Sequence, residues 1–415
     1  MQTTNGSPTW KRTLWILFFN QLISVIGFSS IFPFLPLYVE ELGSSTGTSI
    51  ALLAGLVYSG QAFSMMLTSP IWGSLADRFG RKLMIQRAAF SGTILLLLMA
   101  FVQNAEQLVL LRTIQGLVTG TLAANNALVA AVTPRKRSGY AMGLMQVAFG
   151  VGVAVGPLVG GAIADAYGYS SAFYVTSAML FVAGLVVTLT IQEPPREKHI
   201  KGNRPSLFSE WRAIFATTGV APTFLMRFLS QLSRMTIVAV LPFFARELIS
   251  DGRSLNTFVG TAQGVLAGAA VISAVGLGKL GDRIGHKKIL VGSALAASLL
   301  YFPQAYVTAG WQLLLLQGLT GAAVGGLIPS IGALLANYSK PGQEGAVYGL
   351  DNSISAAGRG AAPMIGSYVT TWFGTASAFI AASMIALITM ISAQVLLPKT
   401  PREAAEAKAL PETQS

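Results

Sequence analysis

Long apolar segments alternate with short polar segments along almost the whole chain. A helix needs about 20 apolar residues to cross the hydrocarbon core of a membrane, whereas a strand of a membrane barrel needs only about 10. Segments of helical length recur twelve times, at residues 12–38, 50–72, 84–103, 107–131, 139–164, 170–191, 215–245, 256–278, 288–307, 310–336, 345–370 and 375–397. The pattern therefore predicts an all-α membrane protein with twelve transmembrane helices.

Polar features of the first half of the chain return in the second half. Residues 73–82 (GSLADRFGRK) recur as residues 278–287 (GKLGDRIGHK). In the same way, 111–116 (LRTIQG) returns at 313–318 (LLLLQG), and 139–144 (GYAMGL) returns at 345–350 (GAVYGL). Matches at a nearly constant separation predict two pseudo-symmetric six-helix bundles, an arrangement common in transporters.

The longest polar segment inside the chain lies near its midpoint and marks a boundary between two units. We expect an N-terminal bundle at residues 1–191, a cytoplasmic linker at 192–213 and a C-terminal bundle at 214–398. Residues 399–415 are polar and are expected to form a cytoplasmic tail.

Basic residues gather on one side of this topology. Of the 28 Lys and Arg residues, 22 lie in the terminal segments, the linker and the loops on the same side, and Arg246 and Arg253 alone lie in the opposite loops. Cytoplasmic loops carry the excess of Lys and Arg, so both termini are predicted to be cytoplasmic in a multi-pass bacterial inner-membrane protein. The net charge of +12 arises from these loops and not from a basic face, so membrane lipids are expected as partners and nucleic acid is not.

The composition argues against most enzyme chemistry. The chain has no Cys, and both histidines, His199 and His286, fall in predicted loops. No phosphate-binding loop of the ATPase type and no nucleophile motif occurs. We therefore expect no enzymatic activity, no metal and no cofactor apart from a coupling proton. A monomer suffices, because the two halves together would complete one cavity.

Residues 73–82 carry the most specific local motif. Glycines permit a tight turn there, and an aspartate can cap a helix or pair with a neighbouring arginine. A tight basic turn that serves topology alone is the simpler interpretation. The candidate gating residues are Gly73, Asp77, Arg78, Gly80 and Arg81, with Asp282 and Arg283 in the repeat.

The fifth predicted span carries a second motif, made of closely spaced small residues. Small residues four positions apart let helices approach closely, and a proline kinks the helix and frees a carbonyl group. Ordinary helix packing is the alternative interpretation. The motif consists of Gly152, Gly156, Pro157, Gly160 and Gly161.

Together with residues 32–43 (FPFLPLYVEELG), these motifs resemble the major facilitator superfamily, and within it the drug–proton antiporters of the MdtG type. The resemblance covers almost the full length. It implies the major facilitator fold and alternating access, with proton-driven export of amphipathic drugs. It also implies a latch at 73–82, a coupling role for Arg112 and an antiporter motif at 152–161 that favours export over uptake.

Charged residues inside the predicted spans depart from that family pattern. The membrane part of the first span has no acidic residue, although drug–proton antiporters often carry one there. The spans contain Arg112, Arg227, Arg234 and Arg359, and Asp351 is the one acidic residue well inside a span. Such groups are costly in a membrane and point to function, although Arg112 could instead extend to the headgroups.

Three interpretations of these charges stay open. In the first, Asp351 neutralises one arginine, and the remaining excess of positive charge attracts an anionic ligand. In the second, Asp351 and Arg359 couple proton binding to conformation. In the third, the charges form a static network. Arg227, Gln231 and Arg234 share one helical face, so they are candidates for the cavity wall. The candidate cavity residues are Asn125, Gln146, Arg227, Gln231 and Arg234.

The leading prediction is therefore a secondary active exporter of amphipathic drugs, with protons as the coupling ion and a small molecule as substrate. One alternative is an exporter of an organic anion or phosphorylated metabolite bound by the cavity arginines. Another is a lipid or glycolipid flippase of the same fold. A sensor or membrane enzyme is least supported, because repeated gating motifs would serve no purpose in a rigid protein.

Overall fold

The computed structural model is all helical in the part of the chain that it describes. It describes residues 9–118, 125, 128–129, 132–134, 137–191, 211–212, 214–249, 254–339 and 344–398, without the side chains of residues 9, 70, 73, 74, 76–78, 138 and 344–346. Nine helices or helix pairs within these ranges are long and apolar enough to cross a membrane. The prediction of an all-α membrane protein is confirmed.

The helices of the first half follow the predicted spans closely. They are α1 (Thr9–Ser30), α2 (Leu35–Leu42), α3 (Ile50–Phe79), α4 (Arg81–Met99), α5 (Ala105–Val118), α7 (Ser138–Tyr167) and α8 (Tyr169–Thr190). The second half contains α10 (Val220–Thr236), α11 (Leu241–Leu248), α12 (Leu255–Ile284), α13 (His286–Gln304), α14 (Gly310–Val324), α15 (Leu327–Tyr338), α16 (Glu344–Phe373) and α17 (Ser377–Leu396).

Within the described ranges, three predicted spans are each divided into two helices. The first span breaks at residues 31–34, the seventh at 237–240 and the tenth at 325–326. In the first two cases a proline, Pro36 or Pro242, occupies the first turn of the new helix. Proline suits that position because its missing N–H would have no intrahelical partner there. The breaks in the first and seventh spans lie at matching places in the two halves.

The expected loop at residues 73–82 is mostly helical, which corrects the sequence-based interpretation. Helix α3 continues to Phe79, and Gly80 alone separates it from α4. Gly80 has φ of 112°, and Gly285 has φ of 98° at the matching junction of α12 and α13. L-residues with a side chain rarely adopt such angles, so each junction depends on its glycine.

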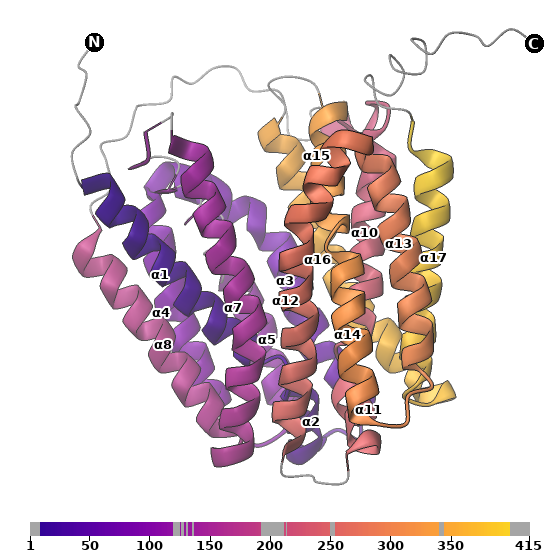
Figure 1. Ribbon diagram of the computed structural model, residues 1–415. Helices are drawn as coiled ribbons and strands as arrows, with labels where there is room; N and C mark the ends of the chain where they lie inside the picture. Colours follow the sequence, from indigo (N-terminus) through magenta and orange to yellow (C-terminus); the bar gives the residue numbers. More distant parts are fainter. Residues whose placement is uncertain are drawn as a thin grey trace, which may run out of the picture.

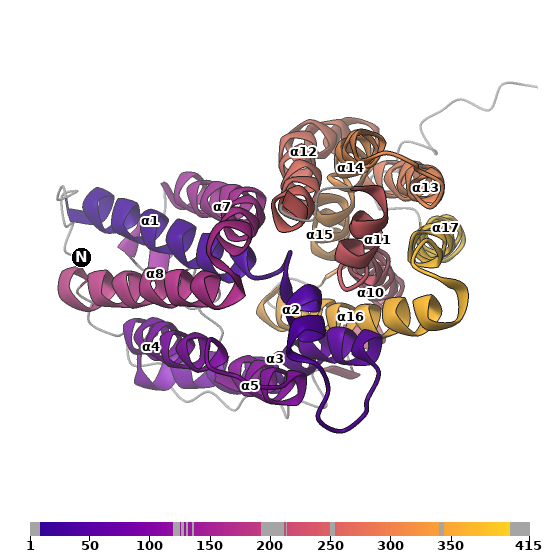
Figure 2. The same ribbon diagram turned by 90° about the horizontal axis from the view of Figure 1, so that it is seen from below.

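The two halves lie side by side and meet along two pairs of long helices. Helix α7 packs along α12, and α3 packs along α16. Figures 1 and 2 show α1 to α8 on one side of the molecule and α10 to α17 on the other. The halves meet at the end that carries α2 and α11, and their ribbons diverge toward the end where α1 begins and α17 ends (Figure 1).

Candidate functional site

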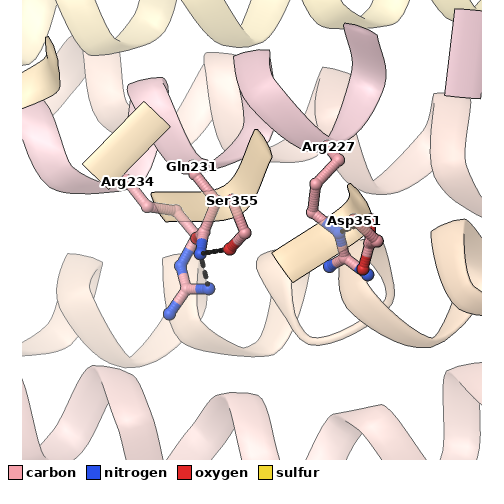
Figure 3. Close-up of polar contacts among 5 residues, drawn as sticks. All are labelled: Arg227, Gln231, Arg234, Asp351 and Ser355. Atoms are coloured by element: carbon pink, nitrogen blue, oxygen red, sulfur yellow. Dashed lines mark hydrogen bonds and ion pairs between the residues drawn. The ribbon is translucent and has the colours of Figure 1, made fainter. Parts of the chain in front are cut away.

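A buried ion pair joins α10 to α16 in the second half. The Arg227 Nε atom donates a hydrogen bond to Asp351 Oδ1 at 2.7 Å, and only 9% of each side chain is exposed. Figure 3 shows this pair at one end of a row of polar side chains along α10. The pair joins residues that are 124 positions apart, so it fixes the two helices against each other.

A second polar group lies farther along the same helices. Gln231 Nε2 donates to Ser355 Oγ at 2.7 Å, and Arg234 Nη1 makes a long hydrogen bond of 3.5 Å to Gln231 Oε1 (Figure 3). Gly358 permits this approach, because a Cβ atom there would lie 2.9 Å from Gln231 Cβ and 2.9 Å from the Phe228 carbonyl oxygen. Gln231, Arg234 and Arg227 therefore share the face of α10 that packs on α16.

Arg359 follows Gly358 on α16 and therefore lies next to the contact that Gly358 makes with Gln231 of α10. Among the described side chains, none forms an ion pair with Arg359. Asp351, two turns away on the same helix, pairs with Arg227 instead. The described part of this cluster thus contains three guanidinium groups and one carboxylate.

Arg112 lies at the centre of a separate cluster in the first half. The side chain is completely buried, so it does not extend to the lipid headgroups. Its Nη1 atom donates to Gln115 Oε1 at 2.8 Å, and its Cζ atom lies 6.0 Å from the centre of the Phe32 ring. Gln61 on α3 also donates to Gln115, at 3.4 Å. The Nε and Nη2 atoms of Arg112 have no hydrogen-bond partner among the described residues.

The two neutral candidates of the first half lie apart in the described contacts. Asn125 is completely buried, and its Nδ2 atom donates to Gln21 Oε1 of α1 at 2.6 Å. Gln146 lies on α7 with an exposed side chain. Asn125 therefore makes a contact within its half, whereas Gln146 is exposed and is not brought together with Asn125.

The small-residue motif of α7 lies where three helices meet. Gly152, Gly156 and Gly160 face α1, where Cβ atoms would overlap Val25, Ser29 and Ser30. Gly161 faces the Asn256 carbonyl of α12, and Gly260 of α12 faces the carbonyl of Pro157. The motif therefore lets α7 contact its own half on one face and the opposite half on another.

The gating candidates are described less completely. Gly73, Asp77 and Arg78 are described by their backbone only, as part of α3, so their side-chain contacts lie outside the described structure. Asp282 Oδ1 lies 3.1 Å from His286 Nε2, four residues ahead in the same half. Arg283 is exposed at the end of α12.

Sequence reasoning missed two polar contacts that connect the halves at the end carrying α2 and α11. Asp165, at the end of α7, accepts hydrogen bonds from the backbone N–H groups of Asn256 and Thr257 at 3.1 and 2.6 Å, in the first turn of α12. The side chains of both residues also donate to it, at 2.7 and 2.6 Å. Glu40 of α2 forms an ion pair with Arg246 of α11. The available signal was an acidic residue at the outer end of a predicted span.

Glu106, another boundary acid, anchors the loop before α3. Its carboxylate accepts hydrogen bonds from the Ser44 hydroxyl at 2.7 Å, from the Ser45 amide at 3.1 Å and from the Thr46 hydroxyl at 2.8 Å. These hydrogen bonds hold the pKa of Glu106 well below its ordinary value, and the bond from the Ser44 hydroxyl has the largest effect. The carboxylate therefore stays ionised and keeps the loop attached to the start of α5.

The family model of the Major Facilitator Superfamily matches the chain twice, at residues 17–222 and 223–415. The chain belongs to the major facilitator superfamily. Multidrug resistance protein MdtG of Enterobacter lignolyticus is 34% identical over 403 residues, covering 96% of both chains. MdtG of Dickeya zeae is 35% identical over 382 residues, covering 91% of this chain and 93% of the relative. The predicted resemblance to MdtG-type proteins is confirmed.

Solved structures show the same fold at low sequence identity. A bacterial homologue of the human lysosomal transporter Spinster, in an inward-facing and occupied conformation, matches with a TM-score of 0.80 and 14% identity over 94% of this chain and 97% of that chain. The nucleoside transporter NupG matches with a TM-score of 0.75 and 14% identity over 92% of this chain and all of that chain. The major facilitator fold is confirmed, and the chain is a multi-pass membrane transporter.

Proposed function

We propose that this chain is a secondary active efflux transporter that exports amphipathic drugs in exchange for protons. The observation that carries the proposal is the full-length similarity to MdtG multidrug resistance proteins. The excess of basic residues on the side of the termini favours a bacterial inner-membrane protein with both termini in the cytoplasm. One chain would suffice, with bundles at residues 1–191 and 214–398 joined by a linker at 192–213 and followed by a tail.

The contacts between the halves support alternating access. Two polar contacts hold the halves together at the end opposite the proposed cytoplasmic face. They are the hydrogen bonds of Asp165 with α12 and the ion pair of Glu40 with Arg246. This arrangement corresponds to an inward-open state, in which substrate enters from the cytoplasm. Export then requires these contacts to break while the halves approach each other at the other end.

Coupling is proposed to use the charged groups inside the spans. Protonation of Asp351 would remove the negative partner of Arg227 and weaken the α10–α16 contact. Arg112 would respond to charge near Gln115 and Phe32, because two of its nitrogen atoms have no partner among the described residues. Neither step needs a metal or a nucleotide.

The test is transport by the purified protein in proteoliposomes, with tetraphenylphosphonium as a lipophilic cation and an imposed proton gradient. We expect gradient-driven transport that stops when a protonophore is added. Arg112→Gln should lower transport by at least about tenfold while thermal stability stays equal or rises. The substitution removes a buried charge that has no carboxylate partner among the described residues, and this relieves a desolvation cost. Lys288→Gln, which removes an exposed charge, is the control. Transport that continues at the same rate without a proton gradient would refute proton coupling.

A further inference from the structure

The cluster between α10 and α16 has more positive charge than its own residues neutralise. Asp351 is committed to Arg227 at 2.7 Å. Arg234 has only a long bond to the neutral Gln231, its Nε atom has no partner among the described residues, and no described carboxylate pairs with Arg359. Gln231 bonds to Arg234 and to Ser355, and it packs against Gly358, the neighbour of Arg359. Arg234 and Arg359 therefore flank the same contact between α10 and α16, and the described residues do not compensate their charges.

Uncompensated guanidinium groups inside a membrane protein are unfavourable unless a ligand or partner compensates them. A guanidinium group is a planar donor that matches the two oxygen atoms of a carboxylate, or those of another oxyanion. Two such groups from adjacent helices form a receptor for one negative charge. The chemistry of the cluster thus selects an anion.

The groups are also accessible to a ligand. Arg234 and Arg359 are partly exposed, whereas Arg227 and Asp351 are buried. An internal void beside Arg234, lined also by Ser230 and Ser233, has a volume of only about 10 Å³. That space suits one water molecule and no organic ligand. A ligand must therefore reach the two arginines from their partly exposed side.

Neutral donors lie next to the charged groups. Ser355 accepts a hydrogen bond from Gln231, so its own O–H remains able to donate. We propose that Arg234 and Arg359, with the Ser355 hydroxyl, bind the negatively charged group of an organic anion, such as a carboxylate, that the protein exports. This inference rests on the proposed efflux function and assigns it a substrate class that the drug-efflux proposal does not specify.

The charge of Asp351 allows a test in which the direction of the change in anion affinity is predicted. Its carboxylate competes with an incoming anion, because it neutralises Arg227 within the same cluster. Removing that charge in Asp351→Asn should raise anion affinity, whereas removing Arg234 or Arg359 should lower it. A purely structural role predicts that all three substitutions weaken binding together.

The experiment measures binding of two matched fluorescent probes to the purified full-length protein. Dansylglycine carries one negative charge at neutral pH, and dansylglycinamide has the same fluorophore without the charge. We expect wild type to prefer dansylglycine. Arg234→Gln and Arg359→Gln should each lower its affinity by about tenfold or more, since each variant loses a hydrogen bond between two charged groups. Affinity for the amide should change less than about twofold in each variant, and Lys288→Gln should leave both affinities unchanged.

Equal weakening of both probes, or no preference for the anion in wild type, would overturn the anion site. A decrease in anion affinity in correctly folded Asp351→Asn would also overturn it. The two conclusions can fail separately when transport of tetraphenylphosphonium and of dansylglycine is measured in proteoliposomes made from the same preparations. Active transport of the cation without anion preference removes only the anion site, whereas transport of neither compound removes the efflux function.

Discussion

Arg227 and Asp351 neutralise each other where bulk water has little access to either side chain. Forming a buried pair yields little net stability, because both ions lose their hydration. Removing one partner is far more harmful, since the remaining ion stays buried without compensation. The energetic importance of this pair therefore appears only when it is broken on one side.

Asp351→Asn should destabilise the protein by about 3–5 kcal/mol, and Arg227→Gln should do so by a similar amount. The double variant should lose much less than the sum, because neither ion is then left alone. Thermal unfolding in detergent of the four proteins measures the coupling. Asp282→Asn is the control, because 74% of the Asp282 side chain is exposed. Additive losses would show that the two side chains do not depend on each other.

At this scale, the sequence revealed which residues were unusual but not how they pair. Four arginines and one aspartate within apolar segments are visible from hydropathy alone. The choice of Arg227 as the partner of Asp351 depends on how two helices far apart in the chain approach each other. The lack of an ion-pair partner for Arg359 among the described side chains and the complete burial of Arg112 depend on the same packing and have no local signature.

Individual helices follow from hydrophobic length, and their irregularities follow from glycine and proline. The sequence predicted the helices but not the breaks at 31–34 and 237–240, because the apolar segments continue across them. It wrongly predicted a loop across 73–82, where only Gly80 adopts an angle that a helix cannot contain. The small residues of α7 were recognised, but which neighbour each one faces depends on packing.

Gly161 offers a test of that packing between elements. A methyl group at this position would overlap the Asn256 carbonyl of α12, so Gly161→Ala must push α7 and α12 apart. We expect a stability loss of about 1–3 kcal/mol, as for other overpacked sites. Gly143→Ala on the same helix is the control, because its Cβ atom would contact nothing within 4 Å. Thermal unfolding compares the two variants, and equal stabilities would contradict close contact at Gly161.

At the scale of the whole molecule, a few polar contacts join the two halves at one end, in addition to the packing of α7 on α12 and of α3 on α16. The sequence contains the residues of these contacts, but its pattern does not indicate which conformation they stabilise. The reason is that open and closed states share the same helices and the same hydrophobic faces. From the sequence, the acids at the span ends can therefore be placed only at span boundaries. Their partners, the first turn of α12 for Asp165 and Arg246 for Glu40, belong to the other half.

Asp165→Asn should shift the population toward a state in which this end is open. Asparagine offers one acceptor oxygen without charge, whereas the aspartate receives four hydrogen bonds from Asn256 and Thr257. Loss of about 1.5–3 kcal/mol from charged hydrogen bonds changes the ratio of the two states by about tenfold or more. Tyr167 and Tyr306 are both exposed and lie on opposite halves. Spin labels on Tyr167→Cys and Tyr306→Cys therefore allow the distance between the halves to be measured by pulsed electron paramagnetic resonance. The chain has no native Cys, so labelling is specific.

The matched control is Glu247→Gln. Glu247 accepts a hydrogen bond from Thr375 at 2.8 Å, but both residues belong to the second half, so this contact does not connect the halves. The control should keep the short distances of the parent protein, whereas Asp165→Asn gains a longer population. If the distances of Asp165→Asn match those of the control, the contact with α12 does not hold this end closed. The ion pair between Glu40 and Arg246 would then be left as the polar contact to test by Arg246→Gln with the same labels.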